Sequence, residues 1–277
     1  MTLRQMERRD RVQAETMWRD TFEESPAFTA YYFDRRFHPE YSFGAFDEER
    51  LIAMALGRPT EINVAGRAVP ALLVAGVSTV PEFRNKGLMH RLMTMLTDRA
   101  RAAGFACCYL HPVSETLYAS LGFRNGTDAL IVRSDETRTH APFVLSDRFD
   151  ANDILSVYCE AQRTHDGMQM RDEEELLTVF ADYATDGGTV LIAYDRDRPV
   201  GYICFSLDGL VHELTALCRS AYETLLDEAA RRAGREIKAI VPIDCWIPGE
   251  RVFSMQYLVF DDAFDLPLNN GFCRLAY

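Results

Sequence analysis

The sequence predicts a mixed α/β (α+β) fold in two successive halves, each with a mostly antiparallel sheet, one pair of parallel strands and flanking helices. Short apolar runs bounded by turn residues alternate with stretches of helical periodicity. An apolar run over 68–80, an amphipathic helix and a second apolar run over 105–110 follow one another, and such a crossover places the two strands parallel. The order of elements then recurs between 150 and 260. With 277 residues, 48% of them hydrophobic, the chain can bury a substantial core.

The first half begins with helical spacing over 11–33, broken at Ser25-Pro26. An antiparallel meander follows, with strands expected at 41–46, 50–57, 61–66 and 68–80. A helix is expected over 88–104 with Gly104 as its stop, then a strand over 105–110, a short helix over 114–122 and a strand over 123–134.

The polar stretch 137–148 reads as a linker. After it we expect two helices near 150–162 and 171–183, strands at 189–195, 199–209 and 211–217, a helix over 220–234, and strands at 236–243 and 252–260. The acidic run 172–175 is expected to be the solvated first turn of a helix, where carboxylates favour the helix dipole.

Charge and cysteine usage exclude several classes of protein. The net charge is −12, and residues 141–277 carry 12 basic against 24 acidic side chains, which disfavours binding to nucleic acid. The seven cysteines include no C-x-x-C pair, so we expect free thiols and neither disulfides nor a metal site. The charged N-terminus and the short apolar runs indicate a cytoplasmic protein that does not enter membranes.

The stretch VSTVPEFRNKGLMHRLM (77–93) is the most informative part of the sequence. A strand leads through a basic turn containing Gly87 into the first turn of a helix. Such a turn presents free backbone N–H groups and the positive helix end to an anion, and Arg84 and Lys86 add charge. We therefore expect a pyrophosphate there, although the order of residues matches neither an ATP-binding P-loop nor a dinucleotide fingerprint.

A second segment, LHPVSETLYASLGF (110–123), follows the strand expected to lie parallel to the first. Arg84-x-x-Gly87, followed some thirty residues later by Tyr118-x-x-x-Gly122-Phe123, resembles the acetyl-CoA signature of the GNAT N-acetyltransferases. More closely, the chain resembles the enhanced-intracellular-survival (Eis) type of this superfamily, in which two GNAT folds occur in tandem and only the first holds a cofactor loop.

That resemblance implies a catalytic GNAT domain over 1–136, the linker at 137–148 and a degenerate GNAT-like domain over 149–277. The sequence departs from the pattern of the Eis type in two ways. Met89 stands where the motif usually has a small residue, and the sequence stops about where the sterol-carrier-like third domain of the Eis type would begin.

Individual roles follow from the resemblance. It implies that Tyr118 is the general acid that protonates the CoA thiolate, and that a strand edge at 77–79 receives the pantetheine arm. The remaining positions would bind acetyl-CoA along the arm, at the pyrophosphate or beside the cofactor, namely Val77, Ser78, Thr79, Arg84, Asn85, Lys86, Gly87, Leu88, Met89, His111 and Ser114. No metal is implied.

The expected activity is acetyl-CoA-dependent transfer of an acetyl group to a primary amine of a small molecule or peptide. The negative second half favours a cationic acceptor. A non-catalytic acyl-CoA-binding or sensing protein is the alternative, and the sequence leaves homo-oligomers open. The general base is open too: a water-relayed path is favoured, with His111, Glu24 and the carboxylate of Tyr277 as further candidates.

Overall fold

The computed structural model describes residues 1–22, 24, 26–135 and 143–273. The chain forms two compact units, and neither unit is one continuous stretch. Unit 1 holds residues 1–61, 69–125 and 255–266, and unit 2 holds residues 62–68, 126–254 and 267–277. Four strands, β3, β4, β6 and β12, therefore begin in one unit and end in the other.

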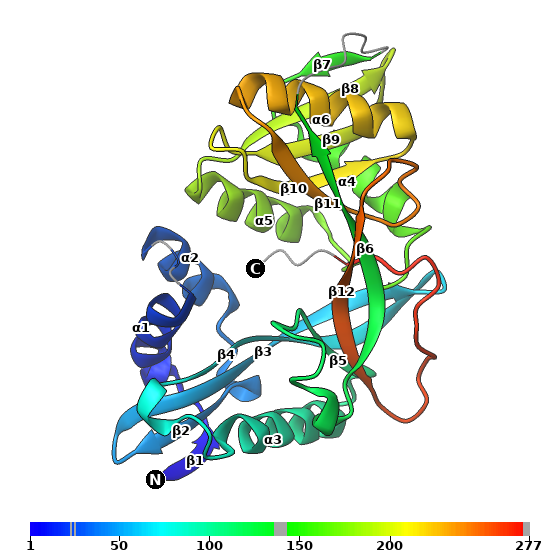
Figure 1. Cartoon of the computed structure of the whole chain (residues 1–277). Helices are drawn as coiled ribbons and strands as arrows, with labels where there is room; N and C mark the ends of the chain where they lie inside the picture. The colour runs from blue at the N-terminus through cyan, green and yellow to red at the C-terminus, as the bar shows by residue number, and fades with distance from the viewer. Residues whose placement is uncertain (23, 25, 136–142, 274–277) are drawn as a thin grey trace. The chain divides into compact units, whose positions relative to one another are not determined.

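Unit 1 is built on a mixed sheet with the strand order β1-β2-β3-β4-β5-β12 (Figure 1). The pairs β1–β2, β2–β3 and β5–β12 are antiparallel, whereas β4–β5 is parallel, as the crossover predicts. The strands are β1 (Thr2–Gln5), β2 (Phe43–Asp47), β3 (Arg50–Val64), β4 (Arg67–Thr79), β5 (Cys107–Leu110) and β12 (Glu250–Val259).

Helices cover both faces of this sheet. Helix α3 (Leu88–Ala102) packs on one face through Leu88, Leu92 and Leu96, in a cluster with β2 to β5. Helices α1 (Arg11–Phe22) and α2 (Pro26–Arg36) pack on the other face, in a cluster centred on Trp18. Helix α3 follows β4 after a short turn, so the N-terminus of α3 lies near the end of β4.

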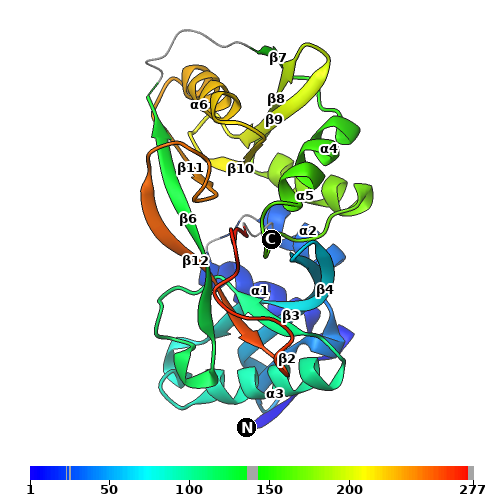
Figure 2. The ribbon, with the colours of Figure 1, turned by 90° about the vertical axis from the view of Figure 1, so that its right-hand side faces the viewer.

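Unit 2 contains a second sheet of order β10-β9-β8-β7, with helices on its two faces (Figure 2). It also holds β11 and most of β6, which pair in antiparallel fashion. Its elements are β6 (Arg124–Ser134), β7 (Val144–Ser146), α4 (Ala151–Gln162), α5 (Glu173–Thr185), β8 (Thr189–Asp195), β9 (Arg198–Phe205), β10 (Val211–Ala216), α6 (Arg219–Ala233) and β11 (Ile237–Val241).

Some elements differ from the sequence-based expectation. The strands expected at 50–57 and 61–66 form the single strand β3, because the chain stays extended through Pro59. The edge strand β1 has no apolar alternation and was not predicted. The expected linker at 137–148 contains β7, and residues 136–142 lie outside the described part of the chain.

The second parallel pair, expected from the order of elements in the second half, is reduced. Strands β10 and β11 are connected by α6, but within the described residues they meet in one parallel bridge, between Leu210 and Lys238. The tandem repeat of the fold therefore stays a prediction.

Two other expectations, on the cysteines and on the acidic run 172–175, are confirmed. All seven cysteines are free thiols, and five of them are buried. Asp172 caps α5 by accepting a hydrogen bond from the Glu175 amide at 2.8 Å, so the acidic run does form a solvated first turn. No helix in the described residues is long and apolar enough to cross a membrane.

Candidate active site

Strands β4 and β5 separate part of the way along their length. Their parallel pairing covers Ala71 to Leu73 on β4 and Cys107 to Tyr109 on β5. Strand β5 ends at Leu110, whereas β4 runs on to Thr79. The backbone groups on this side of 74–79 are thus not used by β5, and such an edge can pair with an extended ligand.

Gly76 lies three residues beyond Leu73, the last residue of β4 that pairs with β5. It has a φ of +59° within β4, a conformation that L side chains rarely adopt. A glycine with positive φ inside a strand bends the strand and locally increases its twist. Sequence reasoning did not single out this residue, although a glycine within an apolar strand run is the usual signal of such a bend.

The turn after β4 leads directly into α3. Pro81–Phe83 form one turn of 3-10 helix, Asn85 and Gly87 have φ of +61° and +72°, and Gly87 is the N-cap of α3. No side chain caps this helix end. The first backbone N–H groups of a helix have no partner within it, so this terminus can donate to an anion.

The turn at Gly87 has open space beside it. A Cβ added at Gly87 would meet no atom within 4 Å, so the chain leaves open space at this position. Arg84, Asn85, Lys86 and Gly87 are all exposed, while Leu88 is buried and Met89 is half-buried in the core beneath. The turn is therefore exposed to solvent, while the first residues of α3 are held in the hydrophobic core.

The two basic side chains of the turn are already engaged. The Arg84 Nε donates to the Thr79 carbonyl at 3.1 Å, and the Lys86 Nζ lies 4.5 Å from the centre of the Phe83 ring. These contacts brace the turn, while the charges stay exposed and add to the positive potential at the helix end.

The three expected arm-binding residues lie at the end of β4. Val77 and Thr79 are half-buried, and Val77 packs against the α3 cluster. Ser78 is buried, with 7% of its surface exposed, and its Oγ has no hydrogen-bond partner within the described residues. A buried hydroxyl without a partner is costly, which is consistent with a place kept for a ligand polar group.

Tyr118 is buried in the same hydrophobic cluster as Leu88, with its ring centre 5.9 Å from that of Phe123. Burial raises the pKa of its hydroxyl to about 12. The phenol therefore stays protonated across the physiological pH range, as a general acid must.

The segment around Tyr118 differs from the predicted helix over 114–122. Its turns are closed by hydrogen bonds three residues apart, such as Ala119 N to Thr116 O, and only Ala119–Leu121 form a short 3-10 helix. A helix over 114–122 would place Ser114 and Tyr118, four residues apart, on one face, but Ser114 is exposed whereas Tyr118 is buried. His111 is exposed and directly follows the end of β5.

A groove of about 500 Å³ lies in unit 1 beside the turn. It runs between α1, the start of β3 and residues 79–84. Its walls carry both signs of charge, from Asp20 and Glu82 and from Arg50 and Arg84. Thr79, the last residue of β4, is one of the residues that line this groove.

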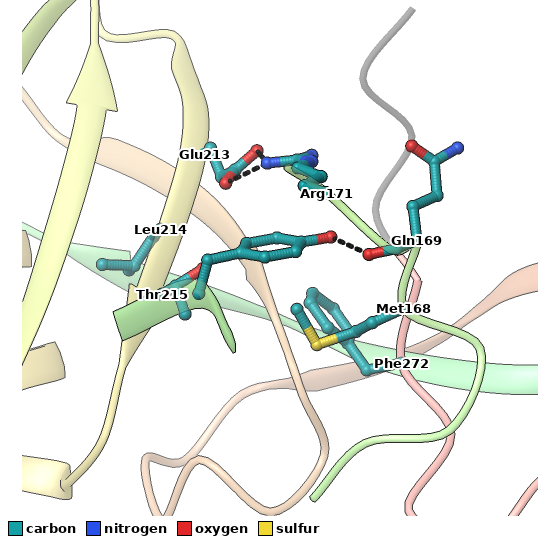
Figure 3. A pocket seen from close by; sticks show the side chains of 8 residues that line it. Met168, Gln169, Arg171, Glu213, Leu214, Thr215 and Phe272 are labelled. Carbon is teal, nitrogen blue, oxygen red and sulfur yellow. Dashed lines mark hydrogen bonds and ion pairs between the residues drawn. The ribbon is translucent and has the colours of Figure 1, made fainter. Parts of the chain in front are cut away.

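Unit 2 contains a buried ion pair that the sequence did not reveal (Figure 3). The Arg171 Nη1 donates to both carboxylate oxygens of Glu213, at 2.8 and 3.0 Å, and the Tyr183 and Tyr202 hydroxyls donate to the same carboxylate. Burial alone would raise the pKa of Glu213, but the Arg171 charge and these donors hold it below its ordinary value.

The cavity beside this pair is too small for an acyl group. Its volume is about 10 Å³, close to the space that one water molecule occupies. The charges of Arg171 and Glu213 neutralise each other, so the shifted pKa values of these two residues reflect a structural network. The candidate active site is therefore the opening between β4 and β5 in unit 1.

The first half of the chain also matches a known protein family. Residues 2–126 match the family model of the acetyltransferase (GNAT) domain. An uncharacterized N-acetyltransferase of Streptomyces avermitilis is 29% identical over 102 residues, which make up 36% of this chain and 24% of that protein. The chain thus spans about a quarter of the length of that curated relative.

Two solved structures share the fold over nearly the whole chain. A protein of unknown function from Enterococcus faecalis, described as a probable N-acyltransferase, superposes with a TM-score of 0.76 at 19% identity, covering 93% of this chain and 72% of that one. Eis1 from Mycobacterium abscessus does so with a TM-score of 0.70 at 17% identity, covering 94% and 74%. The family-model match over residues 2–126 and the shared fold thus show that this part of the chain is similar to GNAT acetyltransferase domains.

Proposed function

We propose that this protein is an acetyl-CoA-dependent N-acetyltransferase whose active site lies between β4 and β5. The observation that carries the proposal is the early end of the β4–β5 pairing at Leu73 and Tyr109, beyond which β4 continues to Thr79 and the turn into α3. One free strand edge and one helix N-terminus are thereby connected in a single stretch of chain.

The two parts of this stretch suit the two parts of CoA. The amide groups of a pantetheine arm can pair with the free edge of residues 74–79 as an added strand would. Its pyrophosphate then lies against the N–H groups of 85–89 and the positive end of α3. The orphaned Ser78 hydroxyl and the open space at Gly87 both support this fit.

Acetyl-CoA supplies an activated thioester carbonyl, which a neutral primary amine attacks. The carbon–sulfur bond breaks, and the departing thiolate takes a proton from the Tyr118 hydroxyl. A free thiol has a pKa near 8.5, so a phenol with a pKa of about 12 gives up its proton at a cost. The desolvation that raises the pKa of Tyr118 also raises that of a thiol in the same site, which reduces this cost.

The amine must lose a proton before or during attack, because an alkyl amine has a pKa near 10.4. Water can relay this proton out of the opening. His111, next to the end of β5, and Glu24, before α2, are further candidates for the base. Tyr277, whose terminal carboxylate is another, lies outside the described residues.

The acceptor in this proposal is a small-molecule or peptide amine, favoured to be cationic by the charge of −12. The carboxylates of Asp20 and Glu82 in the groove beside Thr79 support the same choice. Nucleic acid and membrane partners are disfavoured by that charge and by the absence of long apolar stretches in the sequence. We further propose a cytoplasmic location and leave self-association to measurement.

Two measurements test this proposal. Calorimetry with acetyl-CoA should give one site per chain, because in the sequence only residues 77–89 combine strand, basic glycine turn and helix N-terminus. Release of free thiol should then accelerate in the presence of one member of a panel of cationic amines. Two sites per chain, or no binding, would refute the site. Binding without thiol release for any amine would favour an acyl-CoA-binding protein.

A further inference from the structure

We propose that Gln256, a residue of β12 remote in sequence from the GNAT motifs, is a positioning residue that holds the segment carrying Tyr118. This inference rests on the proposed function, since it assigns Gln256 to the acid step. Residues 255–266 belong to unit 1, so the C-terminal part of the chain completes the domain that contains the candidate site.

Gln256 lies next to the end of β5. It pairs with Leu110, the last residue of that strand, in the antiparallel register of β12 and β5. Its side chain is 2% exposed. The position of Gln256 brings its amide to the chain that leaves β5. The Nε2 finds partners there, whereas the buried Oε1 has none within the described residues.

The Gln256 Nε2 donates two hydrogen bonds, which bracket the Tyr118 segment. One goes to the Glu115 carbonyl at 2.8 Å and the other to the Asn125 Oδ1 at 2.9 Å. Tyr118 lies between these two anchors. One side chain from β12 therefore fixes both the start and the end of the loop that carries the proposed acid.

A second contact from β12 supports the same segment. Leu258 points to the same side of the sheet as Gln256, because alternate residues of a strand share a face. A Cβ added at Gly122 would lie 3.2 Å from the Leu258 Cδ1, so the end of the segment rests on this strand. The polar anchor and the apolar support come from neighbouring positions on one face of β12.

The anchor also explains why the segment is not the helix that its sequence predicts. In an α-helix the Glu115 carbonyl would accept a hydrogen bond from the amide four residues later. That amide, of Ala119, instead donates to Thr116 O at 3.2 Å, and Gln256 occupies the Glu115 carbonyl. The chain is thereby held in successive tight turns that bury Tyr118 and leave Ser114 exposed.

The decisive experiment is a double-mutant cycle between Gln256→Met and Tyr118→Phe, with acetyl-CoA and the amine found in the panel. Methionine has nearly the same length but donates no hydrogen bond. We expect Gln256→Met to lower kcat by about tenfold, because small losses of alignment are costly, while KM for acetyl-CoA stays within about threefold. In the Tyr118→Phe background the same change should lower kcat by less than about twofold.

Two matched variants separate positioning from general stability. Gln162→Met also removes a buried amide donor, but in unit 2, and should leave kcat unchanged at a comparable loss in Tm. Asn125→Ala affects an exposed side chain and removes one partner of Gln256 with little risk to folding. It should lower kcat in the same direction as Gln256→Met, by a smaller factor.

Hydrogen exchange provides a readout independent of the acceptor. Amides within 112–122 should exchange faster in Gln256→Met and not in Gln162→Met. The positioning role would be overturned if Gln256→Met left exchange in this segment unchanged. It would also be overturned if Gln256→Met lowered kcat by the same factor in the wild-type protein and in the Tyr118→Phe background. Unchanged kcat in Tyr118→Phe alone would instead overturn the acid step of the proposed function, so the two failures appear in different measurements.

Discussion

Gly76 of β4 lies directly against the indole ring of Trp18 in α1. A Cβ at Gly76 would come within 2.6 Å of the Trp18 Cζ3, closer than real Cβ contacts, and Gly76 also has a φ of +59°. The bend in β4 and the packing of α1 therefore depend on each other. This bend lies just beyond the last residue pair of β4 with β5.

We expect Gly76→Ala to lower the free energy of unfolding by about 2–4 kcal/mol, because the left-handed backbone and the overpacked ring both become unfavourable. Gly104→Ala is the matched control: Gly104 has a φ of +85° but open space around its Cβ position, so only the backbone cost of about 1 kcal/mol applies. Urea unfolding of both variants measures the difference. Equal losses would show that the ring moves aside without cost.

A second glycine at positive φ tests the pyrophosphate site. Gly87 and Gly104 flank the same helix, and a Cβ at either would meet no atom within 4 Å. Their substitutions by alanine should therefore cost similar stability. Gly87→Ala should nevertheless weaken CoA binding by about tenfold or more, since its methyl group occupies the space where phosphate must approach the backbone.

Calorimetry with CoA measures this difference in affinity. Gly104→Ala should bind CoA as tightly as the wild-type protein. If Gly87→Ala also bound CoA with unchanged affinity, the phosphate groups would have to lie elsewhere on unit 1.

Local pattern predicted much of this structure. The apolar run of residues 189–195 predicts β8 with its observed bounds, and the spacing of Leu88, Leu92 and Leu96 predicts α3 and the parallel crossover. Strand β8 is buried on both faces and α3 on one, so each element forms where its own pattern of apolar residues indicates. The pyrophosphate turn was visible for a similar reason, since its function resides in consecutive residues.

The features that local sequence patterns did not predict depend on contacts between residues far apart in the chain. The Arg171–Glu213 pair joins residues 42 positions apart, and Gln256 reaches Glu115 across 141 positions. Over 114–122 turns replace the expected helix, and the Glu115 carbonyl accepts from that distant side chain while the Ala119 amide donates to Thr116. Strand β1 was missed because an edge strand with charged residues lacks the alternation of a half-buried one.

Unit 2 contains a pH-dependent contact at His165. Its Nε2 faces the Asp244 Oδ1 at 2.9 Å and its Nδ1 faces the Ala161 carbonyl at 2.8 Å, so both ring nitrogens meet acceptors. Burial alone would lower the pKa of His165. The pKa is nevertheless raised, because Asp244 contributes a hydrogen bond and a negative charge, the Ala161 carbonyl accepts a hydrogen bond, and Asp166 adds a second negative charge. The pKa of Asp244 is lowered by the same hydrogen bond.

A histidine whose folded pKa exceeds its unfolded value of about 6.5 stabilises the fold below that pH, and this contribution is lost as pH rises through the folded pKa. Asp244→Asn should therefore lower stability by about 0.5–1 kcal/mol near pH 6, a value limited by solvent screening, and by less near pH 8. Urea unfolding at the two pH values measures this. Glu160→Gln, which breaks the exposed pair with Arg198, should change stability equally at both.

The acid role of Tyr118 makes a prediction about both rate and pH. Tyr118→Phe should lower kcat by about 10- to 10⁴-fold while acetyl-CoA affinity stays within a few-fold, because a general acid acts on the transition state. Steady-state kinetics and calorimetry on the same preparation separate the two quantities. Equal loss of CoA binding would make Tyr118 a packing residue.

The pKa of about 12 sets the pH range over which this acid stays functional. Since the phenol remains protonated well above its ordinary pKa of about 10, kcat of the wild-type enzyme should show no fall caused by Tyr118 up to about pH 10. A rise between pH 7 and 9 is expected instead, as more of the acceptor amine becomes neutral and able to attack. An alkaline fall centred below pH 10 that disappears in Tyr118→Phe would show that the hydroxyl titrates in a more solvated environment, and would contradict a buried acid.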